Sequence, residues 1–253
     1  MMILAAAAVV LFGVDATDAK RPYIEPIAIV ERRGERLTFA QPDSREEKSF
    51  VREYFGGKRY DVFSSGERVA TAFAQSRLEL SCESLAAGVK LSNRLPYNLG
   101  LATSGPLIEP HHDTTREVTP AEQAALMTLL RDRLGVDGSQ NTSLIAVDLD
   151  HDGRPDFIAN GDVTMGRKQH QFLVIASEHH GRMRAEFVYD HRKEADVDGD
   201  TARMEVFDQA DLDADGVDEI IARVHGYESW NWCILKRTRR SWKVVYTGGG
   251  GGC

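Results

Sequence analysis

Two nine-residue segments that share one arrangement of acidic residues constrain this 253-residue chain more than any other feature. Residues 148–156 read DLDHDGRPD and residues 211–219 read DLDADGVDE, and we call them loop 1 and loop 2. Each has acidic residues at positions 1, 3, 5 and 9 and a glycine at position 6. Alternate carboxylates on a tight turn converge on one point, and the glycine permits the sharp bend. The pattern therefore predicts a pair of cation-binding turns.

Calcium is the cation that this spacing favours, because calcium binds carboxylate and main-chain carbonyl oxygens in loops of this kind. Four carboxylates so close together repel one another strongly unless a cation lies between them. An acid-rich surface turn would explain one such loop, but two loops in the same register make chance a poor explanation. We expect one calcium ion in each loop, with position 7 contributing its carbonyl oxygen. The predicted ligands are Asp148, Asp150, Asp152, Arg154 and Asp156 in loop 1 and Asp211, Asp213, Asp215, Val217 and Glu219 in loop 2.

The flanking residues distinguish between two kinds of calcium loop. An EF-hand needs a long helix on each side and a bidentate Glu at position 12. That position is Ala159 in one copy and Ala222 in the other. The segments beside each loop are short and apolar, as in residues 144–147, and glycine follows each loop within a few residues. This composition is typical of strands, so we expect both loops to join strands.

The surroundings of the loops also repeat along the chain. Loop 2 begins 63 residues after loop 1. Around each loop we expect one strand that approaches, one that leaves, and two more joined by a turn. A period of roughly sixty residues with four short strands is the size of one propeller blade or a comparable β-sheet repeat. The expected strands are residues 144–147, 157–159, 171–177 and 185–189 in the first copy and 204–207, 220–222, 232–236 and 242–246 in the second.

Together, these loops and strands resemble the calcium-binding repeats of the FG-GAP and VCBS type, whose pattern is D-x-[DN]-x-D-G-x-x-[DE] followed by apolar residues. Such repeats form β-propeller blades in integrin α-subunits and in many exported bacterial proteins. The resemblance covers residues 143–250 and implies two blade-like antiparallel β repeats with two calcium sites. Only two repeats are visible, so an incomplete or atypical propeller is expected in residues 138–253. It is either a pair of sheets packed on the N-terminal region or a propeller-like domain whose other repeats have lost their loops.

The preceding region, residues 20–137, has no repeat and is expected to be an α+β unit of unknown role, which leaves the chain mainly β. Residues 44–47 form a capping box before a short amphipathic helix that a Gly-Gly pair ends. Residues 119–122 begin a second helix with one apolar stripe, which Gly135 ends. Short aromatic or alternating runs predict antiparallel strands. These runs are residues 60–63, 69–73 and 78–82.

The first residues have the composition of an export signal. Residues 3–14 form an apolar run too short to cross a bilayer, and small residues suited to cleavage follow it. We predict a signal peptide over residues 1–19, no membrane span after its cleavage, and a periplasmic or secreted location. No Lys or Arg precedes the run, so a misplaced start or a short buried element is the alternative. Cys82, Cys233 and Cys253 allow one disulfide, but the sequence does not select a pairing.

Other polar clusters carry less weight. His111 and His112 could bind a transition metal, but adjacent histidines point in different directions and no third ligand has suitable spacing, so we expect a solvated loop. Residues 179–180 receive the same interpretation, and residues 196–200 are interpreted as an acidic turn. Residues 236–240 form a basic run near three tryptophans. A hairpin tip with core tryptophans is favoured there over a surface that contacts anions or carbohydrate.

Charge and motifs narrow the class of function. The formal net charge of −8 argues against nonspecific binding to nucleic acid, which draws on a surplus of Lys and Arg. The sequence has no G-x-S-x-G, HExxH, P-loop or dinucleotide-binding glycine pattern. We expect a non-catalytic protein in which calcium is structural and one face binds a protein or surface in the cell envelope. A periplasmic inhibitor or immunity-type protein that blocks a hydrolase, and a secreted hydrolase stabilised by calcium, are the alternatives.

Overall fold

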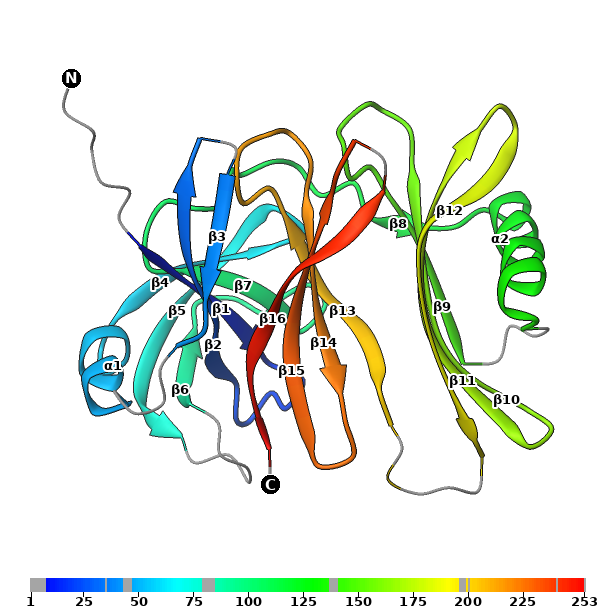
Figure 1. Ribbon diagram of the computed structural model, residues 1–253. Coiled ribbons are helices and arrows are strands. Elements are labelled where there is room, and N and C mark those ends of the chain that lie inside the picture. The colour runs from blue at the N-terminus through cyan, green and yellow to red at the C-terminus, as the bar shows by residue number, and fades with distance from the viewer. Residues whose placement is uncertain are drawn as a thin grey trace.

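The structure is a computed structural model that describes residues 8–34, 36–42, 47–78, 85–136, 141–195, 199, 201–239 and 241–252. Three antiparallel sheets and two helices make up these residues, so the chain is mainly β, as the sequence predicts. Figure 1 shows the three sheets and helix α2 arranged in one row. Neither helix among the described residues combines the length and the apolar character needed to cross a bilayer.

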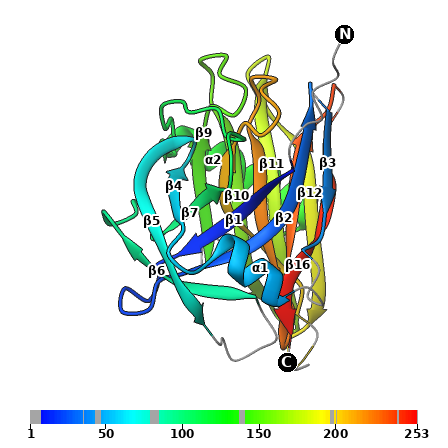
Figure 2. The same ribbon diagram turned by 90° about the vertical axis from the view of Figure 1, so that its left-hand side faces the viewer.

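The N-terminal sheet closes on itself. Its strand order is β1-β7-β4-β5-β6-β2-β3, and an additional pairing of β1 with β2 joins the first six strands of that order into a barrel. Closure leaves these six strands without a free edge, and β3 extends the sheet beyond β2. Figure 2 looks onto this barrel, with α1 in front of it. The bounds are β1 (Val9–Asp15), β2 (Tyr23–Arg33), β3 (Arg36–Ala40), α1 (Glu47–Tyr54), β4 (Arg59–Ser64), β5 (Glu67–Leu78), β6 (Ala86–Leu91) and β7 (Leu99–Thr103).

Strand β1 lies within the segment for which the sequence predicts a signal peptide. Val10, Phe12 and Val14 pack with the barrel strands and α1. Leu11 instead packs toward the sheet of the second repeat. A strand buried on both faces needs a nearly continuous apolar run, which is also the pattern of a signal peptide. The alternative of a short buried element is therefore the arrangement that the structure shows. Export stays a prediction, and cleavage after residue 19 would remove a barrel strand.

Both predicted helices are present. Helix α2 (Pro120–Leu134) begins with the predicted capping box, in which Glu122 N donates to Thr119 Oγ1 and Thr119 N donates to Glu122 Oε2. Gly135 ends it with φ +72°. The predicted strands at 60–63 and 69–73 are confirmed as parts of β4 and β5. Three predicted features lie mostly outside the described residues: the capping box at 44–47, the strand at 78–82 and the acidic turn at 196–200.

The two C-terminal sheets have the predicted strand order. Each repeat is a four-stranded antiparallel meander, with β8 added at the edge of the first. Loop 1 joins β9 to β10, and loop 2 joins β13 to β14. All eight predicted strands are confirmed, each inside a longer strand. The bounds are β8 (Arg116–Glu117), β9 (Thr142–Val147), β10 (Asp156–Met165), β11 (Lys168–His179), β12 (Arg182–Glu194), β13 (Arg203–Ala210), β14 (Glu219–His225), β15 (Ser229–Arg237) and β16 (Trp242–Gly252).

The repeats bury both of their outer faces without further repeats. Leu126 of α2 packs with Phe157 and Phe172 on one side of the five-stranded sheet. On the far side of the four-stranded sheet, Phe207 and Trp232 pack with barrel strands. Sheets need such partners because an apolar face exposed to water is unfavourable. Helix α2, which precedes the expected domain boundary at residue 138, therefore packs as part of the first repeat.

A buried cluster of charges also joins the barrel to the second repeat. On β14, Arg223 Nη2 lies 2.7 Å from Glu25 Oε1, and Nη1 lies 3.3 Å from Asp15 Oδ2. Trp230 Nε1 donates a hydrogen bond to Glu25 Oε2. Breaking such a buried pair on one side leaves an uncompensated charge. The barrel and the second repeat are thus linked by charge as well as by apolar packing.

Candidate metal centre

Loops 1 and 2 have the same backbone conformation. Positions 4 and 6 lie in the left-handed region in both: His151 (φ +54°) and Gly153 (φ +83°), and Ala214 (φ +62°) and Gly216 (φ +82°). The aspartate at position 1 accepts the N–H of position 6 at 2.8 Å in loop 1 and 3.0 Å in loop 2. The aspartate at position 5 accepts the N–H of position 7, at 2.8 Å and 3.0 Å. The shared sequence pattern therefore corresponds to a shared turn.

The first three carboxylates converge in both loops, as their spacing predicts. One oxygen from each of positions 1, 3 and 5 lies within 4.8 Å of the other two. These groups are Asp148, Asp150 and Asp152, and Asp211, Asp213 and Asp215. The residues at position 7, Arg154 and Val217, donate their N–H groups within the turn. Both loops thus gather oxygen donors of the kind that calcium prefers.

The carboxylate at position 9 is buried at the start of the outgoing strand. Asp156 is 4% exposed and Glu219 is 1% exposed. Burial raises the pKa of Asp156 to about 7 and that of Glu219 to about 8. Asp156 Oδ2 and Asp213 Oδ1 have no hydrogen-bond partner among the described residues. A bound cation would favour the ionised form of these groups, so the donor set fits calcium.

In loop 2, a lysine already contacts the converging carboxylates. Lys236 Nζ, from β15, lies 2.7 Å from one oxygen each of Asp213, Asp215 and Glu219. Burial alone would lower the pKa of Lys236, but its three carboxylate partners raise it. This one ammonium group contacts three of the four predicted ligand carboxylates of loop 2, so negative charge remains in excess. Calcium fits here once Lys236 turns toward solvent, where 20% of its side chain already lies.

In loop 1, the corresponding cation is an arginine from the same strand. Arg237 Nη1 lies 2.5 Å from Asp150 Oδ2, and Arg237 Nε lies 3.5 Å from Glu186 Oε2. Successive residues of a strand point to opposite faces, so Lys236 and Arg237 reach different loops. Asp148 and Asp152 have no ion pair with Arg237 among the interactions of the described residues. Loop 1 is therefore the less compensated of the two.

The sequence does not reveal these two cations as partners of the loops. The basic run at 236–240 is predicted to be a hairpin tip with core tryptophans, and Trp232 and Trp242 are indeed buried. Alternation along a strand predicts that Lys236 and Arg237 diverge. It does not predict which loop each one meets, because that depends on how the two sheets pack. No signal in the sequence identifies these contacts.

The histidines at 111 and 112 have different surroundings. His112 is exposed and lies 3.7 Å from Glu67. His111 lies beside His151 of loop 1 and Asp218 of loop 2, although no spacing in the sequence relates these three residues. The loops meet here because Asp218 N donates to Leu149 O at 2.8 Å. His111 is thus not a solvated loop residue, which corrects the interpretation from the sequence.

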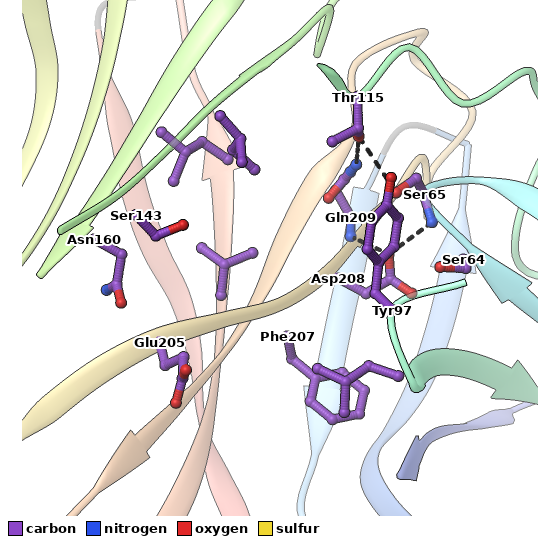
Figure 3. A pocket seen from close by; sticks show the side chains of 14 residues that line it. Ser64, Ser65, Tyr97, Thr115, Ser143, Asn160, Glu205, Phe207, Asp208 and Gln209 are labelled. Atoms are coloured by element: carbon purple, nitrogen blue, oxygen red, sulfur yellow. Dashed lines mark hydrogen bonds between the residues drawn. The ribbon is translucent and has the colours of Figure 1, made fainter. Parts of the chain in front are cut away.

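A cavity of about 210 Å³ lies where the barrel meets the two repeats (Figure 3). Asp208 Oδ1 accepts hydrogen bonds there from Ser65 N at 2.7 Å and Gln209 N at 2.9 Å. Gln209 Nε2 in turn donates to Thr115 Oγ1, as the dashed lines show. Ligand sites usually exceed ~300 Å³. We therefore interpret the cavity as a junction of three sheets, held by Asp208, rather than as a binding site.

Comparison with known proteins adds no identity. No known protein family, curated protein or solved structure matches the chain.

The structure does not select a disulfide among the three cysteines. Cys233 is a free, buried thiol, whereas Cys82 and Cys253 lie outside the described residues.

Proposed function

We propose that this chain is an exported, non-catalytic protein that binds two structural calcium ions through loops 1 and 2. The observation that carries the proposal is the pair of turns with matching hydrogen bonds and converging carboxylates. The resemblance of their sequence to FG-GAP and VCBS repeats supports the same conclusion. Calcium at millimolar concentration outside the cytoplasm suits even a weak site, since binding to the folded state alone raises stability.

The functional face in this proposal is the edge of the molecule that carries both loops. Figure 1 shows loop 1, in green, and loop 2, in orange, at the same upper edge, near the turn between β15 and β16. Calcium fixes such loops in one conformation, which lowers the conformational entropy lost when a partner binds. A protein or surface of the cell envelope is the proposed partner. Recovery of one hydrolase as the sole partner would instead support an inhibitor.

Thermal unfolding in EDTA and in excess calcium tests the proposal. We expect calcium to raise the melting temperature of the wild type by several degrees, because ΔΔG values near 1–2 kcal/mol have that effect in a domain of this size. The double variant Asp150→Ala and Asp213→Ala should lose the response. Magnesium at the same concentration is the control for ionic strength. An unchanged melting temperature of the wild type would exclude structural calcium.

A further inference from the structure

A third group of ligand-type side chains lies where the two loops meet, outside the calcium pattern. His151 occupies position 4 of loop 1 and Asp218 occupies position 8 of loop 2, and the calcium spacing uses neither position. His111 comes from the segment between β7 and β8. One ligand atom from each of the three lies within 4.8 Å of the other two. Three distant parts of the chain therefore supply two imidazoles and one carboxylate to one point.

Each imidazole lies within about the ligand–ligand spacing of a tetrahedral metal ion from one oxygen of Asp218, His111 from Oδ2 and His151 from Oδ1. His111 Nε2 lies 3.2 Å from Asp218 Oδ2, and His151 Nε2 lies 3.5 Å from Asp218 Oδ1. With metal–ligand bonds of about 2.0–2.1 Å, the ligand atoms of a tetrahedron are roughly 3.3 Å apart. The imidazole rings meet edge to face at 4.4 Å between centroids. Small movements of exposed His151 would complete the geometry.

The hydrogen bonds of His111 leave its second nitrogen facing a carboxylate. His111 Nδ1 lies 3.2 Å from Glu109 O, a carbonyl that can only accept, so this contact is a hydrogen bond in the tautomer that carries its proton on Nδ1. In the neutral ring, Nε2 then has a lone pair, which faces the oxygen of Asp218. Two acceptors in contact need either a second proton or a metal ion between them. A metal-bound histidine commonly donates its other N–H to a backbone carbonyl in this way.

The carboxylate of Asp218 is both buried and incompletely satisfied. Its side chain is 1% exposed, and Oδ1 has no hydrogen-bond partner among the described residues. A second proton on His111 would compensate Oδ2 and would leave Oδ1 without a partner. Such a buried oxygen is costly. A metal ion bound by all three side chains would also compensate the charge that faces His151.

The backbone holds His111 in place before any ion binds. His111 N donates to Gly66 O at 3.1 Å. The ring lies so close to Gly66 that a Cβ there would be 2.0 Å from His111 Cε1. Only glycine leaves room for the imidazole, and Gly66 also has φ +73°. Asp218 is held in turn by its N–H bond to Leu149 O, whereas the side chain of His151, 32% exposed, leaves access from solvent.

We propose that His111, His151 and Asp218 bind one divalent transition-metal ion, for which zinc is the best match. Imidazole and carboxylate ligands in a tetrahedral arrangement suit zinc, and a solvent molecule would complete the coordination. Calcium does not compete here, because it prefers oxygen ligands. The ion would connect loop 1, loop 2 and the segment before β8. This site is independent of the calcium proposal, since the two share no side chain.

Zinc titration of the full chain in saturating calcium tests the site, with cobalt absorption as the reporter of tetrahedral coordination. We expect one bound ion in the wild type and at least a tenfold loss of affinity in His151→Asn. Asn tolerates the left-handed backbone of His151, so this exposed variant should fold. His111→Ala and Asp218→Asn should lose the ion as well. His180→Asn is the matched control, because His180 is exposed with φ +52°.

The competing interpretation is a protonated His111 paired with Asp218 and no metal. It predicts that the wild type binds no zinc at micromolar concentration, or that His151→Asn binds zinc as tightly as the wild type. Either result would overturn the proposal. Circular dichroism in calcium confirms folding of each variant. If only His151→Asn and His180→Asn fold, their difference in zinc affinity still decides the question.

Discussion

Loops 1 and 2 share a ligand pattern and a turn, yet their surroundings differ. In loop 2, Asp211 and Asp213 are 5% and 2% exposed, and Lys236 contacts three carboxylates. In loop 1, the equivalent residues Asp148 and Asp150 are only partly buried. Arg237 contacts just one carboxylate of that loop. Loop 2 is therefore a buried site with an internal cation, and loop 1 is a more open one.

Neighbouring elements rather than local sequence produce this difference. The segment before β8 covers loop 2, since Glu109 N donates to Asp211 O. Burial strengthens every charge interaction, because water no longer screens it. A calcium ion must displace Lys236 in loop 2 and only a single arginine contact in loop 1. Calcium should therefore bind loop 1 first.

Lys236→Met should produce the largest effect on stability. It leaves Asp213 and Glu219 buried without their cation, and breaking one side of a buried ion pair costs about 3–5 kcal/mol. Urea unfolding in EDTA measures the loss. Calcium should restore much of it, because the carboxylates are then free to bind the ion. The matched control is Lys243→Met, an exposed lysine on β16. Equal losses in the two variants would show that Lys236 is an ordinary surface residue.

Asp208→Asn tests whether burial raises the pKa of a carboxyl group that lies outside loops 1 and 2. Burial raises the pKa of Asp208 from 3.8 to about 8, so the folded protein keeps a proton that the unfolded chain loses between these values. Wild-type stability should then fall as pH rises through that window. Asparagine does not titrate. From pH 5 to 7 the variant should gain roughly 2–3 kcal/mol relative to the wild type.

Urea unfolding at several pH values measures this difference. Asp132→Asn, on the exposed face of α2, is the control and should show no such trend. A constant difference between Asp208→Asn and the wild type from pH 5 to 8 would mean that Asp208 is ionised in the folded state.

Arg237→Met should have the smallest effect. Arg237 is about as exposed as Lys236, but its partner Asp150 is 27% exposed, whereas Asp213 and Glu219 are fully buried. Ion pairs with a partner open to water contribute about 0–1 kcal/mol. Stability in EDTA should change within that range, while the affinity of loop 1 for calcium should increase. Calorimetric titration measures the affinity, and Arg239→Met, exposed in the same turn, is the control. A weaker affinity would mean that Arg237 organises the loop instead of competing with calcium.

The repeated half of the chain was predictable because its signals are local. Each loop specifies its own turn, and alternating or β-branched runs specify the strands beside it. The capping box of Thr119 and Glu122 predicts the start of α2 for the same reason. Strand β1 was not predictable as a strand, because an apolar run buried on both faces has the composition of a signal peptide.

The contacts of the site depend on packing between segments far apart in the sequence. Lys236 meets loop 2 of its own sheet, whereas Arg237 meets loop 1 of the neighbouring sheet. His111 meets His151 and Asp218 where a backbone hydrogen bond joins the two loops. Spacing along the chain does not contain this information. Ligand patterns are therefore predictable from the sequence here, whereas the cations that compete for those ligands are not.

Calorimetric titration of the wild type, Asp150→Ala and Asp213→Ala with calcium separates the binding of ions by the two loops. We expect two ions of unequal affinity in the wild type. The tighter ion should be lost in Asp150→Ala, and the weaker one should be lost in Asp213→Ala. Absence of calcium binding to the wild type at millimolar concentration, or loss of the tighter ion in Asp213→Ala alone, would contradict the account.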